Sequence, residues 1–199
     1  MNIFGNNIKF SIFGESHGVA IGGIIDGIKP GTKLDFEKID QMMKKRNHRA
    51  VYSTQRAEAD KYEILSGVVD GITTGAPLAF EIRNADTKSG HYSELASVMR
   101  PSHADYGAYV KFKGFADHRG GGHFSGRITA PLTFAGAIFK NELEKKGIFI
   151  YPHILSIGNI RDKSFLEDDG ASIGELGFFP VTSEKIKDEM LSYIESVRA

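Results

Sequence analysis

The chain has 199 residues, of which 25 are lysine or arginine and 25 are aspartate or glutamate, so its formal net charge is zero. A neutral chain has no overall field that attracts nucleic acid or an anionic membrane, so charge recognition must come from local clusters. The sequence has no cysteine, which excludes thiol nucleophiles, cysteine-ligated zinc and redox dithiols. The 41% apolar content is typical of a globular protein, and we predict one domain over residues 1–199.

No segment of the sequence has the pattern of a membrane span or an export signal. The first ten residues lack a charged start followed by an apolar run, and uncharged stretches such as residues 128–139 are too short to cross a bilayer. We therefore expect a soluble, cytoplasmic protein that binds neither membranes nor nucleic acid.

The first third of the sequence predicts strands and one helix. Residues 8–28 alternate short apolar bursts with glycines, which indicates two strands joined by a tight turn at Gly14–Gly18. Residues 35–46 form an amphipathic pattern with Asp35 as N-cap and Phe36, Ile39 and Met43 on one face. The apolar runs at 62–71 and 77–84 are typical of a hairpin or of two neighbouring antiparallel strands.

The rest of the sequence mixes a long loop with helices. Residues 84–124 lack sustained periodicity, which is unusual unless they form a functional loop. A helix is predicted from Ser125 to Gly147, kinked early at Pro131, with its apolar face on Ile128, Leu132, Ala135 and Phe139. Residues 148–160 predict a strand, and residues 183–198 predict a helix buried through Ile186, Met190, Ile194 and Val197. This mixture favours an α+β fold with antiparallel sheets.

A histidine in a glycine-flanked turn is the first candidate for chemistry. In Gly14-Glu15-Ser16-His17-Gly18 the glycines let backbone approach a ligand closely, and the imidazole can act as acid or base near neutral pH. A lone turn histidine also fits a structural role in which it bonds to the backbone. This motif alone does not decide between the two.

A basic cluster without acidic residues runs from Lys44 to Arg56. Arg46, Arg49 and Arg56 lie at or beyond the predicted helix end, and guanidinium groups can grip phosphate or carboxylate in a bidentate way. Lys44 and Lys45 fit a solvated helix end that complements the helix dipole. Nucleic-acid binding is disfavoured because the cluster has few aromatic residues and the chain is neutral.

Three consecutive glycines, residues 120–122, lie just before the long predicted helix. Their backbone N–H groups can converge on an anion, as can those of the helix N-terminus, with Arg119 and Arg127 on either side. The segment is neither a Walker loop nor a dinucleotide-binding motif. A phosphate-binding loop is therefore predicted, with a tight structural corner as the alternative.

The histidines and aspartates around this loop also allow a metal site. The set comprises His103, His118, His123, Asp105 and Asp117. It lacks the H-E-x-x-H pattern or a histidine pair one helical turn apart, so a His/Asp metallohydrolase remains a secondary hypothesis. The sequence also lacks the G-x-S-x-G motif of serine hydrolases.

Several separated segments, taken in order, resemble the chorismate synthase family across essentially the whole chain. They are FGESHG with IGGIIDGIKPG, TQRAEADKYEILSGVVDGITTGAPLAFEIRNAD, RPSHADY and RGGGHFSGRITA. The resemblance implies a carbon–oxygen lyase that forms chorismate from 5-enolpyruvylshikimate 3-phosphate by anti elimination of phosphate and a proton, the last common step of the shikimate pathway. It also implies a requirement for reduced FMN, with NADPH as a reductant of the flavin, and no catalytic metal. The family fold is an α+β sandwich of helices and antiparallel sheets, assembled as a homotetramer.

The resemblance assigns roles to particular residues. His17 matches the histidine that delivers a proton toward the leaving phosphate, and His103 matches the one that protonates reduced flavin. The arginines matched to substrate or nicotinamide-nucleotide binding are Arg46, Arg49, Arg56 and Arg127. The segment matched to flavin contact is His123, Phe124 and Ser125.

The sequence departs from the family pattern in two motifs and in length. His123-Phe124-Ser125-Gly126-Arg127 stands where many members have Arg-Ser-Ser-Ala-Arg, and Arg46-Asn47-His48 stands where many have Arg-Pro-Gly. Family members are considerably longer, and their second half supplies a catalytic aspartate and further flavin-binding loops. We therefore expect this chain, as an N-terminal portion, to carry the two histidines and the arginines but only part of the flavin site. An alternative is a catalytically silent fragment that binds phosphorylated anions.

Overall fold

The computed structural model describes residues 2–46, 59–85, 98–167, 169–170 and 177–198. Two predicted site residues, Arg49 and Arg56, lie outside these ranges. The described residues fall into two compact units, with the first ending at residue 142 and the second containing the residues that follow. This division does not test whether the two units fold together, so the single domain over 1–199 stays a prediction.

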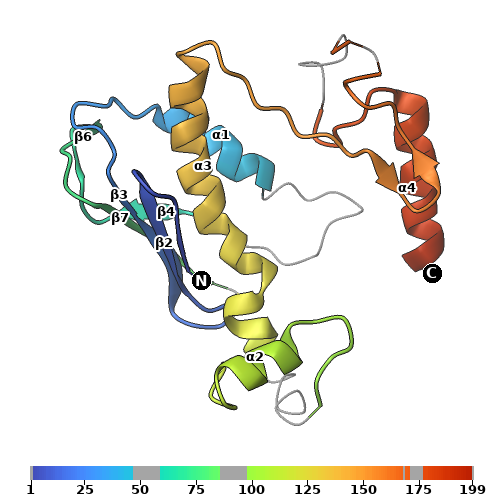
Figure 1. The fold of residues 1–199 in the computed structure, drawn as a ribbon, viewed down its shortest axis with the longest axis horizontal. Coiled ribbons are helices and arrows are strands. Elements are labelled where there is room, and N and C mark those ends of the chain that lie inside the picture. Colours follow the sequence, from blue (N-terminus) through green and yellow to red (C-terminus); the bar gives the residue numbers. More distant parts are fainter. Residues whose placement is uncertain (1, 47–58, 86–97, 168, 171–176, 199) are drawn as a thin grey trace. The chain divides into compact units, whose positions relative to one another are not determined.

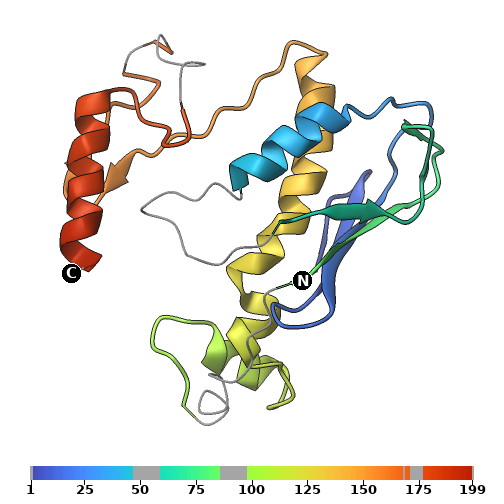
Figure 2. The same cartoon turned by 180° about the vertical axis from the view of Figure 1, so that it is seen from behind.

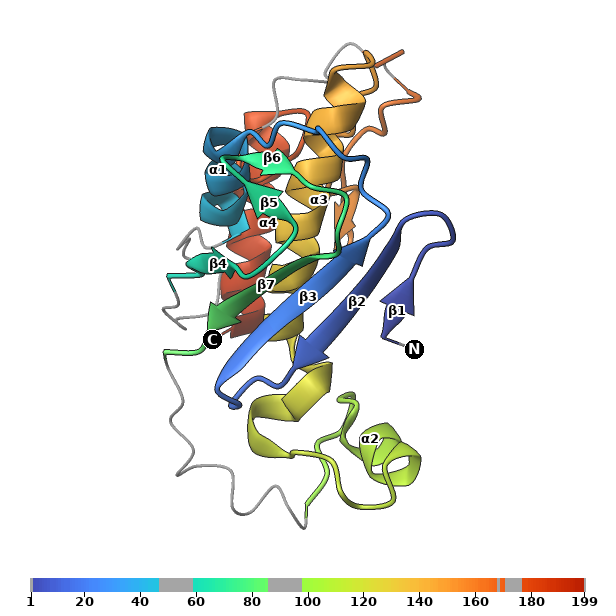
Figure 3. The same ribbon diagram turned by 90° about the vertical axis from the view of Figure 1, so that its left-hand side faces the viewer.

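The first unit is built on a five-stranded sheet in the order β1-β2-β3-β7-β4, in which every neighbouring pair is antiparallel (Figure 3). The bounds are Ile3–Phe4 for β1, Lys9–Gly14 for β2, Ala20–Asp26 for β3, Tyr62–Ile64 for β4 and Leu78–Arg83 for β7. The two strands predicted within residues 8–28 are β2 and β3, paired from Lys9↔Asp26 to Gly14↔Ile21. The predicted α+β class with antiparallel sheets is confirmed.

The predicted strand at 62–71 is interrupted. It divides into β4 and the short β5, Val68–Val69, with Gly67 between them at a φ of +81°. β5 pairs with β6, Ile72–Thr73, in a small hairpin of its own, while β4 pairs with β7 as expected for neighbouring antiparallel strands. The first and last parts of this apolar run therefore belong to two different sheets, because the chain turns at Gly67.

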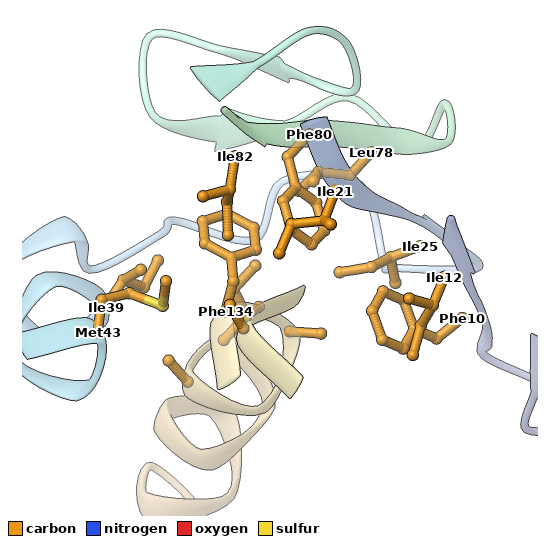
Figure 4. Packing of buried hydrophobic residues seen from close by; sticks show 14 of the residues in the cluster. Phe10, Ile12, Ile21, Ile25, Ile39, Met43, Leu78, Phe80, Ile82 and Phe134 are labelled. Atoms are coloured by element: carbon orange, nitrogen blue, oxygen red, sulfur yellow. The ribbon is translucent and has the colours of Figure 1, made fainter. Parts of the chain in front are cut away.

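The core of the first unit lies between this sheet and helix α3, Thr129–Glu144 (Figure 1). Figure 4 shows the ring of Phe134 pointing from α3 toward β7, where it meets Phe80 at 4.1 Å between ring centroids. Both phenylalanines are fully buried. Burying one such side chain contributes about 1.5–3 kcal/mol, so this contact is a main anchor of helix on sheet.

Helix α3 faces the core with a different set of residues from the one predicted. Phe134 and Ile138 are buried and Leu132 is 42% exposed, whereas Ala135 is buried as expected. Pro131 introduces no early kink, because α3 begins at Thr129 and the proline falls in its first turn, where no backbone N–H is needed. The residues before it, Gly126–Ile128, form a short 3-10 turn.

The predicted helix at 35–46 is α1, Phe36–Arg46, which lies beside α3 (Figure 2). Asp35 accepts a hydrogen bond from the Lys38 N–H at 3.1 Å, which is the expected N-cap. Ile39 and Met43 are buried.

The long loop expected over residues 84–124 contains a short helix, α2, Asp105–Lys111, and a 3-10 segment, Arg119–Phe124. No helix within the described ranges is long and apolar enough to cross a membrane.

The second unit consists of a small hairpin and a helix. The hairpin strands β8, Ser156–Ile157, and β9, Ile160–Arg161, pack against α4, Glu184–Arg198 (Figure 1). The single strand predicted over 148–160 is therefore wrong for residues 148–155. Pro152 lacks the N–H that a ladder requires, and the Gly158-Asn159 step turns the chain back on itself. The predicted final helix is confirmed. Of its predicted core residues, Met190 is fully buried, whereas Val197 is exposed.

Candidate active site

The turn that carries His17 joins β2 to β3 at one end of the sheet. The Gly18 N–H closes it on the Glu15 carbonyl at 3.1 Å. The Ser16 N–H donates to the Gly122 carbonyl at 3.0 Å, which binds the turn to the triple-glycine loop. Ser16 is fully buried and His17 is 8% exposed.

Two of the three glycines provide the surface on which both predicted histidines meet. Gly120 and Gly121 have φ angles of +59° and +90°, a backbone region that favours glycine. A Cβ at Gly120 would lie 2.2 Å from Cε1 of His17, and a Cβ at Gly121 would lie 2.8 Å from Cε1 of His103. Consecutive Cα atoms are about 3.8 Å apart, so the fold brings His17 and His103 to adjacent positions on one loop.

His103 is held by an acid and an arginine at the start of α2. Its Nδ1 lies 2.6 Å from Oδ1 of Asp105, and Arg100 donates to both carboxylate oxygens of Asp105. Nδ1 also lies 3.2 Å from Nη2 of Arg100, which only donates, but the shorter contact is to a carboxylate, which only accepts. We therefore assign the proton to Nδ1, and Nε2 lies on the glycine side. Hydrogen bonds from Arg100 hold the pKa of Asp105 well below its ordinary value, assisted by the His103 contact.

Two of the predicted anion-binding arginines, Arg46 and Arg127, converge on one buried carboxylate. Arg46 and Arg127 both form ion pairs with Asp60, whose side chain is 1% exposed. Arg127 is itself buried, with its side chain 2% exposed, whereas that of Arg46 is 22% exposed. Among the described residues, the cluster therefore contains two guanidinium groups and one carboxylate. Asp60 has a φ of +48° and was not identified from the sequence.

A second residue missed by the sequence reasoning, Asn84, connects this cluster to the His17 turn. Its side chain bonds to Arg127 on one side and to the turn on the other. Both Asp60 and Asn84 lie within the segments quoted for the family resemblance, and Asn84 directly follows the apolar run of β7. A polar residue at the end of a predicted central strand is the signal that would have pointed to it.

In the segment matched to flavin contact, the polar side chains of His123 and Ser125 are hydrogen-bonded to other protein groups. Nδ1 of His123 lies 2.8 Å from the Gly14 carbonyl oxygen and Nε2 lies 3.2 Å from Oδ1 of Asn2. Ser125 caps the 3-10 turn by accepting from the Arg127 N–H at 3.3 Å. Phe124 is 38% exposed and lines an open pocket of about 650 Å³ whose wall also contains Phe13 and Phe112. The aromatic side chains of this wall offer a stacking surface for a planar ring; His123 lines the same pocket, and Ser125 shapes the loop.

A pair of carboxyl groups lines the same pocket. Burial raises the pKa of Glu15 above its ordinary value, and the neighbouring Asp117 carboxylate adds to the effect. Asp117 accepts from the Arg119 guanidinium at 2.9 and 2.8 Å, and these bonds hold its pKa below the ordinary value. Arg119, predicted to flank an anion, is therefore paired with Asp117.

Two backbone N–H groups in and just after the triple-glycine loop bond within the segment. The Gly121 N–H donates to the His118 carbonyl and the Ser125 N–H to the Gly122 carbonyl, both at 3.4 Å. The loop forms a close-packed surface for the two histidines, and the phosphate-binding role expected for it stays a prediction. Within the described part of the chain, no three His, Asp or Glu side chains converge in a way that could hold a metal ion.

These features define an α+β protein whose polar site combines two histidines with a buried arginine cluster. Comparison with known proteins gives the family. The family model for chorismate synthase matches residues 8–199. Chorismate synthase of Azobacteroides pseudotrichonymphae is 42% identical over 100% of this chain and 56% of its own length, and that of Korarchaeum cryptofilum is 39% identical over 99% and 55%.

The fold comparison agrees with the sequence comparisons. A crystal structure of chorismate synthase superposes with a TM-score of 0.71 and 29% identity, covering 97% of this chain and 53% of the other. The chain belongs to the chorismate synthase family. It spans about half the length of the curated relatives it matches.

Proposed function

We propose that this chain supplies the histidine-bearing part of a chorismate synthase, a lyase that converts 5-enolpyruvylshikimate 3-phosphate to chorismate and phosphate. The observation that carries the proposal is the meeting of His17 and His103 on Gly120 and Gly121. Two imidazoles at adjacent positions can handle two protons of one reaction near neutral pH. The family match supports the same reaction.

The charges around the histidines suit an anionic substrate. The substrate carries a phosphate and two carboxylates, and the described cluster presents two guanidinium groups, those of Arg46 and Arg127, beside Asp60. Arginine is the preferred partner of such groups because its guanidinium can bond to two oxygens at once. We propose Arg46 and Arg127 as substrate-binding residues, together with Arg49 and Arg56, which lie outside the described ranges.

Each histidine suits a different proton transfer. His17, buried in its turn, is proposed to give a proton to the leaving phosphate, whose departure places negative charge beside the imidazole. His103 has Nδ1 fixed by Asp105, so its Nε2 is oriented toward the loop for proton transfer. Reduced FMN, when bound, supplies an electron-rich ring that assists loss of phosphate and hydrogen. Phe124 offers that ring a stacking surface, and NADPH is proposed as its reductant.

A chimera of this chain with the remaining half of the A. pseudotrichonymphae relative tests the proposal. With 5-enolpyruvylshikimate 3-phosphate under anaerobic conditions, we expect chorismate and phosphate in equal amounts, and only when reduced FMN is present. The 199-residue chain alone is expected to bind the substrate without forming product. A folded, flavin-binding chimera that forms no chorismate would contradict the proposal.

Two other outcomes separate the alternatives. Substrate binding by a chimera that turns nothing over would favour a silent anion-binding protein. Phosphate release that ignores flavin and stops with a chelator would favour a metallohydrolase. The cytoplasmic location and homotetrameric assembly remain part of the proposal, and gel filtration of the chimera tests the assembly.

A further inference from the structure

The side-chain amide of Asn84 is bonded to both ends of the His17 turn. Nδ2 donates to the Glu15 carbonyl at 3.0 Å and to the Gly18 carbonyl at 2.8 Å. The Asn84 backbone N–H donates to the Val19 carbonyl at 3.1 Å, continuing the ladder between β7 and β3 by one residue. One side chain thus bridges the first and last residues of the four-residue turn that contains His17.

The other end of the same amide is fixed by the arginine cluster. Oδ1 of Asn84 accepts from Nε of Arg127 at 3.0 Å, and Arg127 is held by Asp60. The orientation of the amide is therefore determined, because a flipped amide would set its oxygen against two carbonyl oxygens and its NH₂ against an N–H donor. Among ordinary side chains of this length, only asparagine accepts on one side and donates twice on the other.

We infer that Asn84 is the positioning residue of His17, through which the buried arginine cluster sets the geometry of the histidine turn. The inference rests on the proposed function, in which His17 transfers a proton to a phosphate bound by these arginines. Asn84 acts through the backbone of the turn, whereas the His103 cluster, held by Asp105 and Arg100, has its own supports. A change at Asn84 is expected to alter the surroundings of His17 and leave those of His103 as they were.

Asn84→Asp tests the inference in the 199-residue chain without substrate or flavin. The aspartate can still accept from Arg127, but it replaces the donor that faces the two turn carbonyls with an oxygen. We expect hydrogen exchange of the Gly18 amide to rise at least about tenfold, because both hydrogen bonds from the side chain to the turn are lost. The ring resonances of His17 should move, while those of His103 and the exchange of the Ile25 amide in β3 stay unchanged.

Asn159→Asp is the matched control, because it makes the same chemical change at an exposed turn of the second unit. It should leave both histidines unaffected. If Asn84→Asp fails to fold, Asn84→Ala is measured in the same way, since it removes the bonds without adding a charge. Unchanged Gly18 exchange and His17 resonances, or equal shifts at His17 and His103, would overturn the inference. The chorismate assay of the chimera is independent of this result, so failure of one does not imply failure of the other.

Discussion

The two histidines touch consecutive glycines of the same loop, yet they are held in different ways. His17 is buried, and its turn is fixed by backbone hydrogen bonds, by Asn84 and, beyond it, by the ion pairs of Asp60. His103 is 30% exposed and depends on two neighbours within its own segment, Asp105 and Arg100. The difference indicates that the His17 side is integrated with the folded core, whereas the His103 side is a local cluster. Changes of the same chemical kind should therefore have unequal effects on the two sides.

The largest expected effect is that of Asp60→Asn. The change removes the carboxylate charge that pairs with Arg127, whose side chain is 2% exposed. Breaking a buried ion pair in this way typically costs about 3–5 kcal/mol of unfolding free energy. Urea unfolding of the variant against the parent chain measures the loss. A cost below about 1 kcal/mol, the range of surface pairs, would show that the cluster is not a buried anchor.

Gly120→Ala should destabilise the loop where it contacts His17. The residue has a φ of +59°, and the new Cβ would lie 2.2 Å from the imidazole. Such backbone strain costs about 1–3 kcal/mol, and the ring must also shift. Gly136→Ala is the matched control, because this position in α3 has open space around it and alanine favours helix by about 0.5–1 kcal/mol. Thermal unfolding should therefore move in opposite directions for the two variants.

Asp105→Asn removes the carboxylate charge beside His103, as Asp60→Asn removes the carboxylate charge that supports the His17 turn. Because its groups are partly exposed, we expect a cost of about 1 kcal/mol or less near neutral pH. In the folded state the pKa of Asp105 lies below its ordinary value of 3.8. The carboxylate therefore stabilises the folded chain above pH 3.8, and this stabilisation is lost as the pH falls through the folded-state pKa. The difference between parent and variant in urea unfolding should shrink in strongly acidic buffer. A difference that grows on acidification would contradict this assignment.

Glu15→Gln is expected to have the smallest effect. The pKa of Glu15 is raised in the folded state from 4.5, so the parent chain loses stability as pH rises through this value up to the folded pKa. Glutamine stays neutral and can still donate to Asp117, so the variant should lack that loss and be slightly more stable than the parent near neutral pH. Unfolding free energies on either side of this pH window measure the difference, and a variant that is less stable than the parent near neutral pH would contradict the account.

Local sequence patterns predicted the parts of the fold that depend on local periodicity and capping. The β2–β3 pair, the Asp35-capped α1 and the final helix α4 follow from alternation, spacing and caps. The short α2 was missed because Gly107 interrupts its seven residues and only one of them, Ala108, is buried. The face of α3 was misassigned because Leu132 and Phe134 are both apolar and only packing against Phe80 selects one.

The candidate site was predictable in its principal residues but not in its supports. His17, His103 and Arg127 were identified from motifs, and the structure places the first two on adjacent glycines. Their partners Asp60 and Asn84 are polar residues whose role depends on contacts across 67 and 43 positions of sequence from Arg127. Local pattern does not encode such pairings, because they arise when strand order and helix packing bring distant segments together.

The most direct test of the central claim is steady-state chorismate formation by the chimera carrying His17→Ala or His103→Ala. If the two histidines transfer protons, kcat should fall by about 100-fold to 10,000-fold in each variant, while KM stays within a few-fold of the parent value. Unchanged kcat in both variants would contradict the claim and assign the two histidines to structure.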